Sequence, residues 1–230
     1  VYKSQASARL PKGIMTAVGQ ILKVFPMIAY NGALALDETG RALITRFFEA
    51  KEAAEICRYV EEQNNGAAWN IYSGYVWYSA EKESDWVKKE ESIVDVKSTK
   101  TSIEQIAKLQ GVHKGLIMGE PKEIDRMQKE LSKKYIDLDF VKSSPTLLEI
   151  VLKGVSKRSA VEIVAQEYGV DLKDCLAFGD NYNDEEMLRA VGHPFLMGNA
   201  PEDLKKQFKP ENITLDNNHD GIAKALESIE

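Results

Sequence analysis

Two carboxylates four residues apart follow a short apolar run in the last third of this 230-residue chain. Cys175-Leu176-Ala177 leads into the sequence Phe178-Gly179-Asp180-Asn181-Tyr182-Asn183-Asp184. This order predicts a strand that delivers Asp180 and Asp184 to the loop before the next helix, the edge where open α/β sheets bind ligands. Two close carboxylates repel each other, and Mg²⁺ relieves that repulsion because it prefers oxygen ligands. A turn followed by a helix cap uses the same residue types, so both interpretations stay open.

Other polar residues could complete a phosphate site. Ser7 offers a hydroxyl and backbone N–H groups near a helix start, although a helix cap is the simpler interpretation. Lys157 falls in the first turn of a predicted helix, where the helix dipole disfavours a cation. It could neutralise a phosphoryl oxygen or be an ordinary surface lysine. Asn183 could hydrogen-bond a substrate, and Asn31-Gly32 ends a strand at the same edge or simply forms a turn.

Composition narrows the class of protein. The net charge of −6 argues against nucleic acid or an anionic membrane surface as the main partner, and 43% hydrophobic residues suffice for a real core. No run approaches the length of a membrane span, and Val1-Tyr2-Lys3-Ser4 is not the start of a signal peptide. Cys57 and Cys175 lack metal-ligand spacing and are predicted to be structural thiols of a cytoplasmic protein. His113, His193 and His219 are expected to be solvated.

The last third of the chain alternates strands and helices, which predicts a parallel sheet covered on both faces. A helix beginning after Ser156 and stopped by Gly169 separates the first two strands. Strands are expected at 147–152, 175–178, 195–197 and 213–215, and helices at 185–190, 202–208 and 221–229.

The first 49 residues are predicted to belong to the same sheet, whereas the middle of the chain has a different pattern of apolar and charged residues. Expected here are a helix over 12–24, a strand over 27–30, and a hairpin around Asp37-Glu38-Thr39-Gly40. Residues 50–146 predict an inserted α+β domain with helices over 50–63 and 121–134 and strands over 69–73, 75–79, 115–118 and 138–142. Its aromatic residues are expected to form mainly the core of that domain.

Together these motifs resemble the haloacid dehalogenase-like (HAD) hydrolase superfamily, specifically its Cof-type phosphatases. The resemblance extends over essentially the whole chain and depends on the order and spacing of six segments. These are Ala6-Ser7-Ala8-Arg9, Tyr30-Asn31-Gly32-Ala33, Gly154-Val155-Ser156-Lys157, the stretch 179–188, Gly198-Asn199-Ala200 and Asp220-Gly221-Ile222-Ala223. It implies a Rossmann-like, doubly wound parallel core formed by residues 1–49 and 147–230, with residues 50–146 as a cap that selects the substrate.

The resemblance also implies a chemistry. Asp180, supported by Asp184, would bind Mg²⁺. Ser7, the backbone of Ala8, Lys157 and Asn183 would hold the phosphoryl oxygens. The expected activity is hydrolysis of a small phosphorylated metabolite, such as a sugar phosphate, through an aspartyl-phosphate. No nucleic-acid or membrane partner is implied, and the oligomeric state is not determined by the sequence.

One part of the family pattern is missing. Family members begin with a strand ending in Asp-x-Asp, which carries the nucleophile, and only six residues precede Ser7. We therefore expect the nucleophile upstream of this sequence and expect the 230 residues alone to be inactive. The rival interpretation is a catalytically inactive protein of the same fold that binds a phosphorylated ligand or a partner. A sugar-phosphate mutase of the same superfamily is a third possibility.

Overall fold

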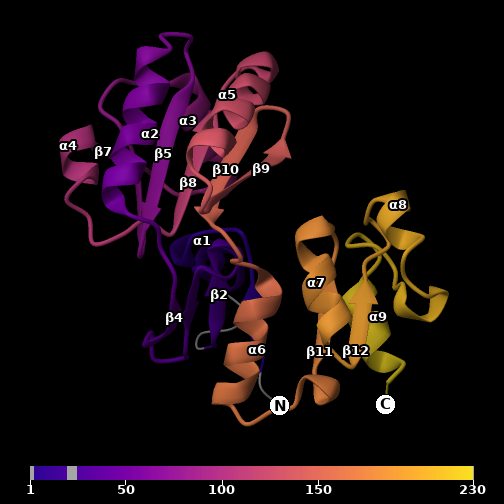
Figure 1. Cartoon of the computed structure of the whole chain (residues 1–230). Helices are drawn as coiled ribbons and strands as arrows, with labels where there is room; N and C mark the ends of the chain where they lie inside the picture. Colours follow the sequence, from indigo (N-terminus) through magenta and orange to yellow (C-terminus); the bar gives the residue numbers. More distant parts are fainter. Residues whose placement is uncertain (1–2, 20–24, 230) are drawn as a thin grey trace. The chain divides into compact units, whose positions relative to one another are not determined.

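The computed structural model describes residues 3–19 and 25–229. Contacts between residues divide the chain into two compact units, Val1–Val155 and Ser156–Glu230, which are described separately. The first unit contains a four-stranded sheet and a six-stranded sheet, and the second contains a pair of parallel strands (Figure 1). Both parallel and antiparallel pairing are therefore present, as expected for an α/β core that carries an α+β insertion.

The four-stranded sheet has the order β1-β2-β3-β4. Strand β1 (Gln5–Ala6) pairs in parallel with β2 (Met27–Ala29), and α1 (Pro11–Val18) connects them. The predicted helix over 12–24 is confirmed as far as Val18, and its end at 20–24 lies outside the described residues.

The predicted hairpin is confirmed. A short 3-10 turn, η1 (Tyr30–Gly32), leads from β2 into β3 (Leu34–Leu36), which pairs antiparallel with β4 (Ala42–Thr45). At the turn, one carboxylate oxygen of Asp37 accepts hydrogen bonds from the backbone N–H groups of Thr39 and Arg41. An aspartate that binds the backbone two residues ahead is a common way to fix a turn.

The inserted region, defined here as residues 50–152, is built on a sheet of order β7-β6-β5-β8-β10-β9. Its elements, in chain order, are α2 (Ala50–Glu62), β5 (Ala68–Ser73), β6 (Val76–Ala80), α3 (Asp85–Val94), β7 (Thr99–Thr101), α4 (Ile103–Ile106), β8 (Lys114–Met118), α5 (Pro121–Lys134), β9 (Leu138–Ser144) and β10 (Leu147–Leu152).

The two faces of this sheet contribute to different hydrophobic clusters. One face packs against α2 and α5, where Ile56 and Met127 are fully buried (Figure 1). The opposite face, including Tyr72 and Trp77, packs with residues of α1, β2 and β3. The prediction that most aromatic rings of this region are buried in its own core holds for Trp69. Tyr72 and Trp77 are buried in the cluster shared with α1, β2 and β3, and Tyr75 is exposed.

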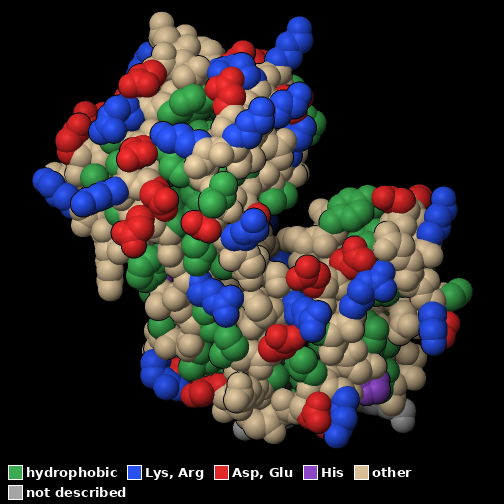
Figure 2. All heavy atoms as spheres, viewed as in Figure 1, with side chains coloured by type: hydrophobic (Ala, Val, Ile, Leu, Met, Phe, Trp, Pro, Cys, Tyr) green, Lys and Arg blue, Asp and Glu red, His purple; other side chains and the backbone are tan. Residues whose placement is uncertain are grey.

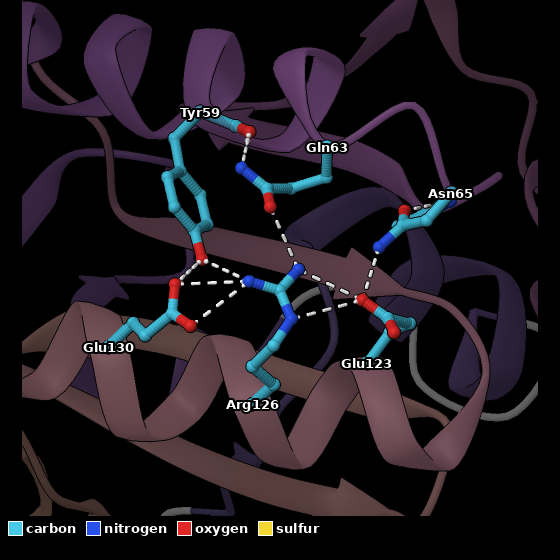
Figure 3. Close-up of polar contacts among 7 residues, drawn as sticks. Tyr59, Gln63, Asn65, Glu123, Arg126 and Glu130 are labelled. Carbon is cyan, nitrogen blue, oxygen red and sulfur yellow. Dashed lines mark hydrogen bonds and ion pairs between the residues drawn. The ribbon is translucent and has the colours of Figure 1, made fainter.

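A polar network on the surface joins α2 to α5 (Figure 3). The Arg126 guanidinium lies at its centre and donates hydrogen bonds to the carboxylates of Glu123 and Glu130. It also donates to Gln63 and to the Tyr59 hydroxyl, both on the α2 side. A planar guanidinium presents five N–H donors in a fixed geometry and can serve more acceptors than a lysine ammonium, which has three donors. Arg126 thus links α2 and α5, which are also joined by the Tyr59–Glu130 hydrogen bond and the Lys134–Glu55 ion pair.

One predicted strand belongs to a different sheet. Leu147–Leu152 is expected in the parallel core, but this strand pairs antiparallel with both β8 and β9. Only Pro145 and Thr146 separate β9 from β10, so the two strands form a hairpin. The run Leu-Leu-Glu-Ile-Val-Leu is nearly continuous in apolar residues, and such a run fits a two-sided buried strand of either kind of sheet.

The second unit alternates helices and strands as predicted. Helix α6 (Lys157–Glu167) and η2 (Leu172–Asp174) precede β11 (Leu176–Gly179), and α7 (Tyr182–Ala190) connects β11 to its parallel partner β12 (His193–Leu196). Helix α8 (Glu202–Lys205), η3 (Pro210–Asn212) and α9 (Gly221–Glu227) follow. The strand predicted over 213–215 is reduced to one parallel bridge between Ile213 and Leu196.

The surface is of mixed charge. On the face drawn in Figure 2, Lys and Arg side chains are interspersed with Asp and Glu side chains over both units. Interspersed charge is typical of a solvated surface. Within the described ranges, no helix has the length and apolar character needed to cross a bilayer.

His113 differs from its prediction, because it is buried rather than solvated. Its Nδ1 atom accepts a hydrogen bond from the Gly74 N–H at 3.2 Å, and its Nε2 atom lies 3.0 Å from the Thr45 hydroxyl. The ring also stacks on Tyr30. Since Nδ1 is an acceptor, the neutral imidazole carries its proton on Nε2. Burial disfavours the charged form and lowers the pKa of His113 to about 4.

We expect His113 to make the stability of the first unit depend on pH. Between about pH 4 and 6.5 the imidazole of His113 is protonated in the unfolded chain and neutral in the folded protein. The free energy of unfolding therefore rises with pH across this window. The stabilising contribution is complete above the unfolded pKa and is lost as pH falls towards 4. The expected loss is about 2–3 kcal/mol, taken from the size of the shift.

Tryptophan fluorescence during urea unfolding measures this effect, because Trp69, Trp77 and Trp86 all lie in the first unit. His113→Gln should flatten the pH dependence between pH 4 and 6.5. Thr45→Val, which keeps the imidazole, should retain the slope. Parallel curves for the wild type and His113→Gln would contradict the assignment.

Candidate active site

The two predicted aspartates both follow β11, but they differ in burial. Asp184 lies in the first turn of α7 and is buried, whereas Asp180 is exposed on the loop before the helix. Gly179 makes this possible, because a Cβ atom at that position would lie 2.4 Å from the Cβ atom of Asp184. The glycine of the motif is therefore required by the close approach of the second aspartate.

Asp184 has both carboxylate oxygens occupied. Oδ1 lies 2.5 Å from the Lys157 ammonium nitrogen, and Oδ2 accepts hydrogen bonds from the backbone N–H groups of Asp180 and Asn181 at 2.9 and 3.2 Å. The Lys157 and Asp184 side chains are 8% and 6% exposed. The interpretation of Lys157 as a surface lysine is therefore wrong. One buried carboxylate fixes both the lysine and the loop that carries Asp180.

The helix start that places Lys157 is built as predicted. Ser156 is the N-cap of α6, and its hydroxyl accepts a hydrogen bond from the Ser159 N–H while the Ser159 hydroxyl is bonded to the Ser156 backbone. This reciprocal capping satisfies N–H groups that a helix start otherwise leaves unpaired. Lys157 follows as the first helical residue, and its long side chain reaches across to α7.

Asp180 is held on one side only. Its Oδ2 atom accepts a hydrogen bond from the Asn199 side-chain amide at 3.1 Å, and the Asn199 carbonyl oxygen in turn accepts from the Asn217 N–H. Oδ1 of Asp180 accepts no hydrogen bond from the described residues. The geometry thus restricts rotation of the Asp180 carboxylate and leaves one oxygen available to a cation.

The remaining loop residues cap the start of α7 and connect the loop to α8. Asn181 is the N-cap of α7, and its side chain accepts a hydrogen bond from the Tyr182 N–H at 2.8 Å. The Tyr182 hydroxyl binds the carboxylate of Asp203, which ties the loop to α8. Asn183 is exposed in the first turn. The helix-cap interpretation of this motif is therefore correct, but the cap also positions the lysine and both aspartates.

In the first unit, Ser7 and Asn31 are brought together. The Ser7 N–H donates to the Ile28 carbonyl at 2.8 Å, and the Asn31 N–H donates to the Ser7 carbonyl at 2.9 Å. The Ser7 hydroxyl accepts a hydrogen bond from the Arg9 N–H at 3.1 Å and so stabilises a local turn. The helix-cap interpretation of Ser7 is wrong, because α1 begins at Pro11 and its N-cap is Leu10. Both loops lie at the carboxyl ends of the parallel strands β1 and β2.

The second of these loops is strained. Tyr30, Asn31 and Gly32 have consecutive φ values of 52°, 55° and 110°. A positive φ is unfavourable for a bulky buried residue such as Tyr30 and costs of the order of 1–3 kcal/mol. The Tyr30 hydroxyl offsets part of this cost by donating to the Gly74 carbonyl at 2.8 Å. Such strain is often found where a loop must present backbone groups to a ligand.

The structure assembles two groups of predicted site residues, one in each unit. Lys157, Asp180 and Asp184 form one group with Asn183 beside them, and Ser7 and Ala8 form the other with Asn31. Among the described residues, no cluster of three or more His, Cys, Asp or Glu side chains is arranged to hold a metal ion.

Sequence reasoning gave Asn199 no role at Asp180. Gly198-Asn199-Ala200 follows β12, which is the parallel partner of β11. Its position at the carboxyl end of the strand next to β11 could have indicated that Asn199 lies near Asp180. The loop is held close to its neighbours, because the Gly198 N–H donates to the Leu215 carbonyl at 3.2 Å. The Lys205 ammonium binds the Gly198 carbonyl at 3.1 Å.

Comparisons with known proteins agree with this arrangement. The sequence profile of the haloacid dehalogenase-like hydrolase family matches residues 4–226. A protein of Haemophilus influenzae whose provisional name is phosphatase is 32% identical over 221 residues, covering 96% of this chain and 82% of that protein. An HMP-PP phosphatase of Escherichia coli O6:H1 is 28% identical and matches 77% of this chain and 69% of its own.

A solved structure matches the fold. The crystal structure of a Thermotoga maritima protein superimposes with a TM-score of 0.89 and 30% sequence identity, covering all of this chain and 85% of that one. The chain belongs to the haloacid dehalogenase-like hydrolase family. The predicted Cof-type resemblance and the predicted fold class, a Rossmann-like α/β core with an inserted α+β cap, are confirmed.

We expect the two aspartates to differ sharply in their effect on stability. Asp184→Asn leaves the Lys157 ammonium buried without a counter-charge, which should lower the local stability of the second unit by about 3 kcal/mol. The matched change Asp180→Asn alters an exposed carboxylate and should stay within about 0.5 kcal/mol.

Hydrogen exchange of residues 156–190 measures this difference, because no tryptophan lies in the second unit. Asp184→Asn should accelerate exchange at the Asp180 and Asn181 amides. Equal protection in the two variants would show that the buried pair does not hold this loop.

Proposed function

We propose that this protein is a Mg²⁺-dependent phosphatase that hydrolyses a small phosphorylated metabolite through an aspartyl-phosphate. The observation that carries the proposal is the buried Lys157–Asp184 pair below the exposed carboxylate of Asp180 at the carboxyl end of β11. A fixed cation beside an available carboxylate suits a phosphoryl group together with a hard metal ion. The names of the relatives from Haemophilus influenzae and Escherichia coli agree with a phosphatase.

The donor set at Asp180 fits Mg²⁺. Asn199 holds one oxygen of the carboxylate, and the other is available, so the residue can serve as a single oriented oxygen ligand. Asp184 supports it indirectly, since both of its oxygens bind protein donors. When bound, Mg²⁺ would supply charge neutralisation between the phosphate and the attacking group.

The remaining residues would position the phosphoryl group. Lys157 presents a positive charge whose place is fixed by Asp184, and Asn183 offers an amide at the start of α7. Ser7 and the Ala8 backbone, at the end of β1, would bind two further oxygens. Rigid placement of such donors is the main contribution that a protein makes to phosphoryl transfer. The inserted region would act as the cap that selects the leaving group.

The nucleophile in this proposal is an aspartate outside the 230 residues. Within the described residues, β1 pairs only with β2 and β11 only with β12, so each site-bearing strand has an open edge. A parallel strand bearing the nucleophile would pair with an edge of this kind. Its carboxylate would attack phosphorus and expel the leaving group, and water would then attack phosphorus to release phosphate.

Other nucleophiles are poor candidates. Cys175 immediately precedes β11, and burial raises the pKa of its thiol, which disfavours the reactive thiolate. His113 is buried in the first unit with both ring nitrogens engaged. The catalytically inactive binding protein remains the alternative, and the experiments below separate it from the enzyme.

The first test is substitution of Asp180 in the full-length protein. Asp180→Ala should lower Mg²⁺-dependent hydrolysis of p-nitrophenyl phosphate by at least about 100-fold, since removal of a charge-stabilising group commonly costs this much. Glu202→Ala, an exposed acid in the same unit, is the control and should retain activity. Full activity of Asp180→Ala would overturn the metal assignment.

The second test compares the 230 residues with the full-length protein. We expect the shorter chain to show no Mg²⁺-dependent turnover, because its described residues contain no activated nucleophile, and the longer chain to be active. Equal turnover by both would show that the nucleophile lies within the 230 residues. Inactivity of a folded full-length protein would favour the binding-protein alternative.

A further inference from the structure

A second buried ion pair lies in the inserted region. The Lys114 ammonium nitrogen is 3.0 Å from Oε1 of Glu149, and the two side chains are 9% and 14% exposed. Lys114 belongs to β8 and Glu149 to β10, the adjacent antiparallel strand. In this register Glu149 is opposite Leu116, so Lys114 and Glu149 share one face of the sheet.

Both members of the pair reach the loops that follow β1 and β2. Lys114 donates a hydrogen bond to the Ala8 carbonyl at 3.4 Å, and Glu149 accepts one from the Asn31 side-chain amide at 3.4 Å. These loops form the edge at which parallel α/β sheets bind ligands. The pair therefore lies beside Ala8, one of the residues proposed to hold the phosphoryl group.

Contact with these two loops does not by itself require a buried pair of charges. Withdrawing two charges from water costs free energy, and replacing a buried pair with apolar residues of similar size is often neutral or stabilising. The surroundings favour apolar residues, because Tyr72 and Leu116 on the same face belong to a hydrophobic cluster. Such a cluster could be completed without charges.

We propose that Lys114 and Glu149 determine substrate specificity by contacting the leaving group of the phosphomonoester. This inference depends on the function proposed above. A leaving group is joined to phosphorus through one bridging oxygen, so its first atoms must lie within a few bonds of a phosphate held by Ala8. An ammonium group and a carboxylate side by side provide a donor and an acceptor at that place.

The charge of the surroundings indicates the class of leaving group. The half-buried Glu90 carboxyl is also electrostatically coupled to Lys114 and Glu149, and burial raises its pKa. Two acidic side chains thus accompany the buried lysine, and the other nearby cations, Arg9 and Lys89, are exposed. A second phosphate would bring more negative charge to a place without a net positive charge. The pair is suited to a neutral, hydroxyl-rich leaving group, as in a sugar phosphate.

The test uses the full-length protein and the double variant Lys114→Met/Glu149→Leu, which keeps volume and removes both charges. We expect its kcat/KM for hexose and pentose monophosphates to fall by at least tenfold. The value for p-nitrophenyl phosphate should change less than threefold, because its leaving group carries no hydroxyl besides the oxygen that bridges to phosphorus. Lys142→Met/Asp125→Leu, an exposed pair of the same region, is the matched control and should change neither value.

Each alternative outcome has a defined meaning. Equal changes for sugar phosphates and p-nitrophenyl phosphate would overturn the specificity role, as would no change for either. A wild type that prefers an organic diphosphate or rejects every sugar phosphate would overturn the substrate class. Absence of any phosphatase activity in the wild type would instead count against the proposed function. Urea unfolding monitored by tryptophan fluorescence verifies that the variants are folded.

Discussion

The arrangement of the second unit depends on one buried interaction, the ion pair between Lys157 and Asp184. A lysine at the first position of a helix has an unfavourable interaction with the helix dipole, and its burial adds a desolvation cost. The Asp184 carboxylate compensates for both by lying 2.5 Å away, and its second oxygen binds two backbone N–H groups of the preceding loop. The start of α6, the start of α7 and the position of Asp180 are therefore coupled.

This coupling explains why several small features occur together. Gly179 leaves the space that Asp184 fills, and Ser156 starts the helix that carries Lys157. Asn199 then restrains the carboxylate of Asp180, which is the exposed member of the two aspartates. Each contact alone is modest, but together they hold a cation and an oxygen ligand at a fixed distance from each other. Such preorganisation lowers the cost of binding a phosphoryl group, because few groups must be reoriented.

The first unit uses comparable means at its own loops. Consecutive residues with positive φ after β2 are held by hydrogen bonds to Ser7 and Gly74, and the Lys114–Glu149 pair approaches the same loops from the six-stranded sheet. The chain thus combines buried charge with strained backbone at the carboxyl ends of its parallel strands. Both features cost stability, and both are common where proteins bind ligands.

The sequence by itself determined most elements and the local motif. Some features have local physical causes and can be predicted from neighbouring residues. These are the apolar run ending in Gly-Asp, the Ser156 cap and the aspartate of the hairpin turn. Sequence could not decide the sheet to which Leu147–Leu152 belongs, since a continuous apolar run suits parallel and antiparallel pairing alike.

Only the tertiary structure showed that His113 is buried, that Lys114 meets Glu149, and that Asp184 binds a lysine rather than presenting free oxygens. These outcomes depend on which distant segments share a surface. Burial and charge pairing are properties of that surface, and residue order specifies them only through the complete fold.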